Sequence, residues 1–115
     1  MKVINITRGG ALLADKADLA STFLKRLIGL LNRSSLNKGE ALILQPSNSI
    51  HSFFMRFSID VLFLNKHKRV IKAISPFKPY RLTKVYFNAV FTIELPVGVI
   101  ETTATKEGDI ISIVN

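Results

Sequence analysis

The sequence predicts a mainly β domain, sandwich-like or a partly open barrel of short strands, with one short α-helix in its N-terminal half. Short runs of β-branched and aromatic residues recur at roughly ten-residue spacing, with turn residues between them. Helical spacing of apolar residues stands out in one segment. A chain of 115 residues, 48% of them hydrophobic, can bury one core. We therefore expect a single domain over residues 1–115.

The N-terminal half contains a predicted hairpin followed by the helix. Residues 3–8 alternate apolar and polar and suit a first strand, which Gly9 and Gly10 end in a turn, and residues 12–16 run back against it. A helix inside residues 20–31 can be capped by Ser21 or Thr22. Its expected apolar face consists of Phe23, Leu24, Leu27, Leu30 and Leu31. Gly29 and the polar residues after Leu31 predict that the helix is short.

From Ala41 onward the pattern is that of β-strands. Residues 65–68 form a polar break between two β-branched runs and are expected at a hairpin tip. The predicted strands cover residues 41–45, 59–64, 69–74, 89–95 and 109–114. The helix is then expected to cover one end of the sandwich or barrel.

Composition restricts the classes of function. The chain has no cysteine, which excludes disulfides, thiolate metal sites and a cysteine nucleophile. The first residues contain no apolar run of the length of a signal peptide or membrane span, so we expect a cytoplasmic protein without a membrane partner. Sixteen Lys and Arg against eight Asp and Glu give a net charge of +8, which favours polyanions or is simply a solvated basic surface.

Four segments carry a resemblance to a known family. The central one, residues 49–65, reads SIHSFFMRFSIDVLFLN and resembles the signature of domain-of-unknown-function family 192. Residues 29–36 are similar to that family's Gly-Leu-Met helix end, residues 93–98 to its Leu-Glu-Leu-Pro-Ala-Gly, and Gly108 and Asp109 to its last turn. The resemblance implies a mainly β, sandwich-like fold and supplies no activity, cofactor or catalytic residue.

The sequence also departs from the family pattern. Ser58 stands where Pro is common, Ser52 where Thr is common, and Ser47 near a frequent Cys position. At the hairpin tip Asn65 replaces a common Asp, and the Gly that is common there is absent. The change at Ser52 retains the hydroxyl, whereas the change at Asn65 puts any role of an acidic side chain there in doubt.

Known catalytic motifs are absent from the sequence. His51 and His67 lie 16 residues apart without the spacing of a metal motif, so we expect no metal site. No G-x-S-x-G turn precedes a serine, and Gly9 and Gly10 lack the residues of a phosphate loop. We expect no cofactor, and whether the protein is an enzyme stays open.

Charged and polar residues that interrupt the apolar stretches form the candidate polar pocket. An unpaired charge there would be costly, so these side chains should find partners, and we expect them in one semi-buried cluster. Arg56 could bind one carboxylate with two hydrogen bonds, while His51 donates to another. Pairing with Arg56 or with backbone N–H groups is the structural alternative to a catalytic role. The expected cluster consists of His51, Arg56, Asp60 and Glu94, and Ser52 completes the candidate polar pocket.

A candidate basic loop covers residues 76–86, where bases and aromatics alternate without acids. Its cations are Lys78, Arg81 and Lys84, which suit a nucleic acid, while the alternative is a rigid connection that covers a sheet edge. The neighbouring aromatic run of residues 53–57 could also stack on bases, but its position next to a buried strand favours the core.

Three hypotheses for function follow. The first is a small ligand-binding or interaction module, for a small molecule or protein partner, with its pocket around residues 49–60. The second is a hydrolase-type or glycan-processing enzyme that uses Asp60 and Glu94 with His51. The third is a weak, nonspecific binder of polyanions such as nucleic acid. The ligand and the oligomeric state are left open.

Overall fold

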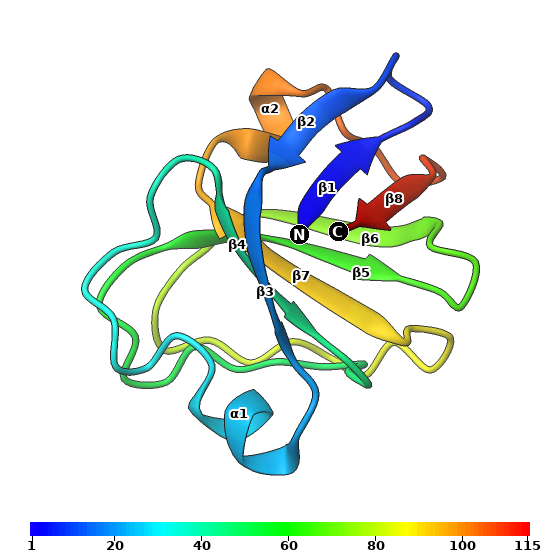
Figure 1. The fold of residues 1–115 in the computed structure, drawn as a ribbon. Coiled ribbons are helices and arrows are strands. Elements are labelled where there is room, and N and C mark those ends of the chain that lie inside the picture. Colours follow the sequence, from blue (N-terminus) through cyan, green and yellow to red (C-terminus); the bar gives the residue numbers. More distant parts are fainter.

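The computed structural model describes the backbone of residues 1–115 and every side chain except those of Phe23, Leu24 and Leu27. It contains eight strands and two short helices (Figure 1). The elements are β1 (Lys2–Asn5), β2 (Ala11–Ala14), β3 (Lys16–Ala20), α1 (Phe23–Ile28), β4 (Glu40–Leu44), β5 (Ile59–Leu64), β6 (Val70–Phe77), β7 (Phe91–Pro96), α2 (Val99–Thr102) and β8 (Ile111–Val114).

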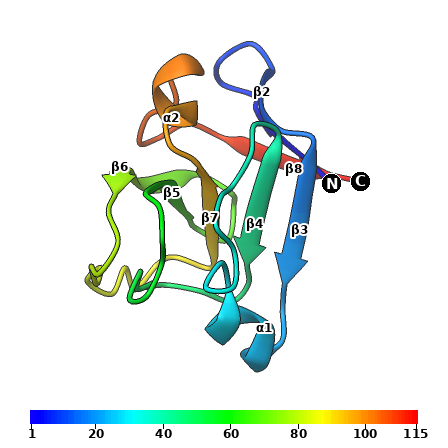
Figure 2. The same cartoon turned by 90° about the vertical axis from the view of Figure 1, so that its left-hand side faces the viewer.

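The strands form two sheets that do not close into a barrel. The small sheet has the order β2-β1-β8 and the large sheet the order β3-β4-β7-β5-β6. All neighbouring strands are antiparallel except β3 and β4, which run parallel. A parallel pair needs a long crossover connection, and residues 21–39, which include α1, supply it. The two chain ends lie side by side because β1 pairs with β8 (Figures 1 and 2).

The chain passes from the small sheet to the large one at Asp15. The backbone N–H groups of Asp15 and Lys16 both donate to the carbonyl of Gly39, at 3.0 and 2.8 Å. Gly39 has a φ of +87°, and a Cβ there would lie 2.5 Å from Oδ1 of Asp15. The backbone conformation favours glycine at this position, whereas the contact with the flexible Asp15 carboxylate could be relieved by rotation of that side chain.

The large sheet is covered on both faces. One face packs against the small sheet, in a core that includes Val3, Leu62 and Ile93. The other face packs against residues from the α1 end and from the loops before β5 and before β7, in a second core that includes Leu30, Val61 and Phe63. This double burial explains why β5 is buried along its whole length and reads as a continuous apolar run interrupted by Asp60.

The structure confirms the predicted fold class and most predicted elements. The helix begins after Thr22, whose hydroxyl accepts a hydrogen bond from the Lys25 N–H at 3.1 Å, and ends at Gly29 after six residues. Leu30 is buried as expected, while the side chains of Phe23, Leu24 and Leu27 lie outside the described residues. Residues 65–68 form the expected hairpin tip between β5 and β6.

Three features differ from the sequence-based expectation. Strand β3 follows β2 directly and joins the other sheet, which local patterning could not indicate. Strand β6 continues through Pro76, which is tolerated because β6 is an edge strand and the missing N–H removes no ladder bond. The second helix, α2, was not predicted. It lies at the opposite end of the molecule from α1 (Figure 2).

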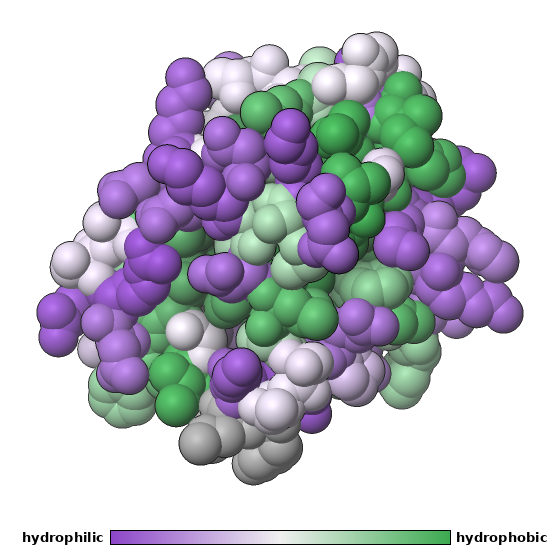
Figure 3. Space-filling view, in the orientation of Figure 1, coloured by the Kyte–Doolittle hydropathy of each residue, from purple (hydrophilic) through white to green (hydrophobic). Residues whose placement is uncertain are grey.

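Apolar side chains also reach the surface. On the face shown in Figure 3 they gather over β1 and β2, and others lie among hydrophilic side chains in the middle of the face. Ile6 and Leu12 are among the exposed apolar residues of this region. No helix in the part of the chain that the structure describes has the length and apolar character needed to cross a membrane.

Candidate functional site

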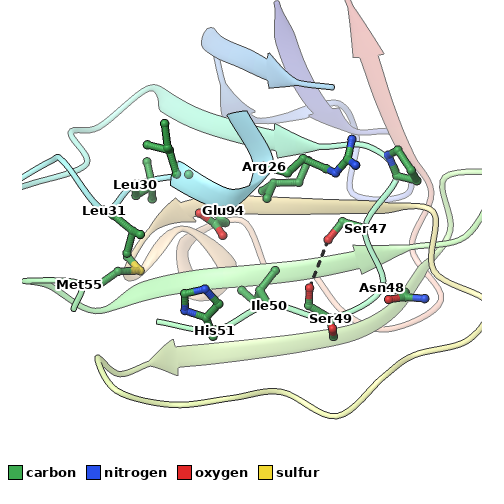
Figure 4. Close-up of a pocket in the computed structure, with 14 residues that line it drawn as sticks. Arg26, Leu30, Leu31, Ser47, Asn48, Ser49, Ile50, His51, Met55 and Glu94 are labelled. Atoms are coloured by element: carbon green, nitrogen blue, oxygen red, sulfur yellow. Dashed lines mark hydrogen bonds between the residues drawn. The ribbon is translucent and has the colours of Figure 1, made fainter. Parts of the chain in front are cut away.

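The candidate site is built around Glu94, in the middle of the central strand β7. Glu94 lies opposite Leu42 of β4 and Val61 of β5. Since successive residues of a strand point to opposite faces, Ile93 and Leu95 enter the core between the sheets and Glu94 points to the other face. There its side chain enters a cavity (Figure 4).

Glu94 is a buried acid without a hydrogen-bond partner. The residue is 4% exposed, and its Oε1 atom has no partner among the described residues. Burial raises the pKa of Glu94 from 4.5 to about 8, because the ionised form loses its hydration. At neutral pH the carboxyl is therefore mostly protonated and offers an O–H donor beside a carbonyl acceptor.

The cavity has a volume of about 290 Å³ and lies between α1, the end of β4 and the loop after β4. Apolar side chains from residues 28–31 and from residues 50–55 form much of its wall, and polar groups from residues 47–51 form the rest (Figure 4). The lining residues are Arg26, Ile28, Gly29, Leu30, Leu31, Leu44, Pro46, Ser47, Asn48, Ser49, Ile50, His51, Met55 and Glu94.

The cation at this cavity is already engaged by backbone groups. One guanidinium nitrogen of Arg26 donates to the Ser21 carbonyl at 2.7 Å and to the Gln45 carbonyl at 3.4 Å. Arg26 takes part in neither of the two ion pairs that the described side chains form. Among the described side chains no ion pair stabilises the ionised form of Glu94, which agrees with its raised pKa.

His51 is held at the cavity in a defined orientation. Its Nδ1 accepts a hydrogen bond from the Phe53 N–H at 3.2 Å, and its ring stacks on the Phe53 ring with centroids 5.4 Å apart. With Nδ1 as the acceptor, the neutral ring carries its proton on Nε2, which becomes a donor. His51 and Glu94 are thus the two predicted site residues that the structure brings to one cavity (Figure 4).

Asp60 lies on the opposite face of the large sheet, so the expectation of one cluster is wrong for this residue. It is fully buried, and its Oδ2 accepts from the N–H groups of Gly98 and Ile100 at 3.0 and 2.9 Å. Its Oδ1 accepts from the hydroxyl of Ser75. Val61 lies opposite Glu94, so these two side chains point to the same face of the sheet. Asp60 is the neighbour of Val61 in β5 and points to the other face, so the sheet separates the two acids. A mechanism with Asp60 and Glu94 in one cleft is therefore excluded.

Arg56 and Ser52 also lie outside the cavity. The Arg56 side chain is exposed and belongs to neither of the described ion pairs, so the expected bidentate pairing is wrong. The Ser52 hydroxyl is buried, donates to the Lys78 carbonyl and accepts from the Arg81 N–H at 2.9 Å. Ser52 therefore attaches the basic loop to the central motif.

The predicted basic loop keeps its three cations at the surface. Lys78, Arg81 and Lys84 are exposed and line one open depression together with residues such as Phe77 and Tyr86. The ammonium of Lys84 lies 5.4 Å from the centroid of the Tyr86 ring. This surface is separate from the lining of the Glu94 cavity.

The site offers hydrogen-bonding groups beside apolar surface. The described residues contain no group of three His, Asp or Glu side chains arranged to hold a metal ion. The cavity instead combines a protonated carboxyl, an imidazole and hydroxyl groups with apolar walls, as small-molecule sites do.

Sequence reasoning did not identify Arg26, Asn48 or the wall formed by Gly29 to Leu31. A signal for that wall was nevertheless present, because residues 29–36 carry part of the family resemblance. The three main segments of that resemblance are distant in sequence, and residues from each of them, including Leu30, His51 and Glu94, line the same cavity.

The fold and the cavity together define a class of small two-sheet β domain with a buried acid in a cavity on the outer face of its larger sheet. The chain belongs to the family DUF192, described as Uncharacterized ACR, which it matches over residues 4–113. It is 40% identical to a UPF0127 protein of Thermococcus kodakarensis, over 96% of this chain and 71% of that protein. It is 31% identical to a UPF0127 protein of Pyrococcus furiosus, over 93% of each chain.

Two solved structures share the fold. A protein of unknown function from Novosphingobium aromaticivorans superposes with a TM-score of 0.86 at 20% identity, over 98% of this chain and 84% of that one. A protein from Sinorhizobium meliloti described as a candidate transcription regulator gives a TM-score of 0.84 at 17% identity, over 96% and 91% of the chains. At these identities the similarity shows the fold alone.

Proposed function

We propose that this protein is a binding module for a small ligand, with the Glu94 cavity as its site. The observation that carries the proposal is the buried Glu94 carboxyl whose Oε1 has no partner among the described residues. Leaving a buried polar atom unpaired costs about 1–3 kcal/mol, and a ligand that supplies the missing hydrogen bond recovers this cost.

The protonated carboxyl selects the chemistry of the ligand. It presents one donor and one acceptor side by side, so a neutral amide-like group, which presents an acceptor beside a donor, satisfies both atoms at once. The apolar wall formed by residues such as Leu30, Ile50 and Met55 favours an apolar body on the same molecule. The proposed ligand is a small neutral compound with an amide-like edge.

A thermal-shift and NMR screen of small amides, carboxylic acids and amines tests this proposal. We expect amide-bearing compounds to bind, and their affinity to fall as Glu94 ionises above about pH 8. Glu94→Gln keeps a donor beside an acceptor and should bind the amides without this pH dependence. Glu94→Leu should lose binding by about tenfold or more.

The controls separate the proposal from its alternatives. Glu101→Gln changes an exposed acid on α2, at the far end of the molecule, and should bind like the parent protein. Preferential binding of amines, strengthened as pH rises and abolished by Glu94→Gln, would show that the site recognises cations instead. Equal binding by Glu94→Leu and the parent protein would contradict the assignment of the site.

A further inference from the structure

A second surface, distinct from the cavity, exposes large apolar side chains on two neighbouring loops. Phe54 is 73% exposed, Tyr80 56% and Leu82 68%. We call Phe54 and Tyr80 the aromatic platform. The rings of Phe54 and Tyr80 contact each other edge to face, with centroids 5.8 Å apart. Because a buried position would be favourable for each side chain, such a group at the surface indicates a binding role.

The backbone of the aromatic platform is held in an unfavourable conformation. Phe54 has a φ of +66° and Tyr80 a φ of +61°, a region that bulky residues rarely occupy. The strain orients two rings that contact each other, although each ring remains largely in solvent. Strain of this kind persists where the surrounding structure enforces it, commonly at functional sites.

Ser52 supplies that enforcement. Its carbonyl accepts from the Tyr80 N–H at 2.9 Å, and its own N–H donates to the Arg81 carbonyl at 2.9 Å. Its buried hydroxyl makes the bonds to Lys78 and Arg81 described above, and His51 forms a β-bridge with Leu82. The two loops, which run together at one side of the molecule in Figure 2, are thus fixed to each other.

The charge beside the aromatic platform is positive. Lys78, Arg81 and Lys84 line the open depression next to it, and residues 76–86 contain no acid. Exposed aromatics beside a cationic groove are the combination that binds single-stranded nucleic acid, in which bases stack on the rings and phosphates lie along the cations. The cationic surface is concave, which suits an extended nucleic-acid strand. A surface that inserts into a membrane would instead be a convex apolar tip.

We propose that the aromatic platform and these three cations bind single-stranded nucleic acid without sequence selectivity. This function is independent of the ligand cavity, because the aromatic platform shares no residue with the cavity lining. A rigid loop that merely covered a sheet edge would not need to hold Phe54 and Tyr80 in strained conformations at the surface.

Fluorescence anisotropy with labelled mixed-sequence DNA and RNA of about 12 nucleotides tests the proposal on the full chain. We expect single strands to bind more tightly than a duplex, with an affinity that falls steeply as salt rises. The paired change of Phe54→Leu and Tyr80→Leu keeps apolar side chains and removes stacking, and should weaken binding roughly tenfold or more. Changing Lys78, Arg81 and Lys84 to Gln should weaken binding and reduce its salt dependence.

Control variants remove comparable charge or apolar surface elsewhere. The charge control changes the exposed Lys2, Lys38 and Lys106 to Gln and removes the same number of positive charges. The apolar control changes the exposed Ile6 and Leu12 to Ala. Both controls should bind nearly as the parent protein does, and thermal melting confirms that each variant folds. Absence of single-strand binding, or equal losses in the charge controls, would overturn the proposal. Binding to anionic phospholipid vesicles that survives the Leu changes, without binding to oligonucleotides, would overturn it in favour of a membrane surface.

Discussion

At the scale of single residues, Glu94 should make the stability of the protein depend on pH. Its folded pKa of about 8 exceeds its ordinary value of 4.5, so the folded chain holds a proton that the unfolded chain releases between these values. The stabilisation is complete below about pH 4.5 and is lost as pH rises through 8. We expect the free energy of unfolding to fall by a few kcal/mol over this interval.

Glu94→Gln isolates this effect. The amide has nearly the same shape and carries no titratable proton, so the variant should show a flatter pH profile and equal or exceed the parent protein in stability above about pH 8. Urea denaturation at a series of pH values measures both quantities. Parallel profiles for the two proteins would mean that Glu94 is ionised or hydrated in the folded chain.

The residue scale also shows where sequence reasoning succeeded and failed at the site. Glu94 and His51 could be selected because polar groups inside apolar stretches are costly. Asp60 met the same criterion, yet it lies on the other face of the sheet, because side chains alternate along a strand and pairing register decides which residues align. Register depends on contacts between distant segments, and local patterning does not contain it.

At the scale of elements, Asp60 explains a helix that the sequence did not predict. Its carboxyl group accepts hydrogen bonds from two backbone N–H groups at the start of α2. This capping stabilises a four-residue helix that is too short to be stable by itself. The cap comes from a strand about forty residues earlier in the chain, so no N-terminal capping signal stands next to the helix.

Asp60→Ala should therefore destabilise the protein by about 3–5 kcal/mol, since it leaves the partly buried N–H groups of Gly98 and Ile100 unpaired. Asp60→Asn keeps one acceptor oxygen and an amide that can donate to the Ser75 hydroxyl, and should cost about half as much. Chemical denaturation gives the stabilities, and hydrogen exchange at Gly98 and Ile100 reports the cap. A loss for Asp60→Ala no larger than that for the exposed control Glu101→Gln would contradict this role.

At the scale of the whole molecule, a polar cluster connects residues 5–8 near the N-terminus with residues 106–109 near the C-terminus. Asp109 is buried and accepts hydrogen bonds from the Asn5 amide, from both Nε and Nη2 of Arg8, and from the Lys106 N–H. Burial alone would raise the pKa of Asp109, but these hydrogen bonds and the charge of Arg8 outweigh it and hold the pKa below its ordinary value.

Asp109→Asn should lower the free energy of unfolding by about 2–3 kcal/mol at neutral pH, because it removes acceptors from Arg8 and Asn5. The depressed pKa means that this stabilisation is present above about pH 3.8 and is lost as pH falls through the lower folded value. Denaturation at neutral and acid pH should show the gap between the two proteins closing in acid. A stability difference that stays constant with pH, or an equal difference for Asp18→Asn at an exposed position of β3, would count against the cluster.

The architecture of the whole molecule was predictable in class but not in detail. Runs of β-branched residues identified most strands, and the capped apolar segment identified α1. The division into two sheets, and the parallel pairing of β3 with β4, depend on the turn at Asp15 against Gly39, which joins residues 24 positions apart. Such long-range contacts place the α1 end, the central motif and β7 around one cavity.

The central claim is that Glu94 is a buried, protonated acid facing that cavity. Carbon-13 NMR of the glutamate side-chain carboxyls, with the Glu94 signal assigned by its absence in Glu94→Gln, measures its titration directly. We expect a midpoint near 8 that moves when a cavity ligand binds. A midpoint near the ordinary value of 4.5 would show that the carboxyl is solvated or paired, and would contradict the claim.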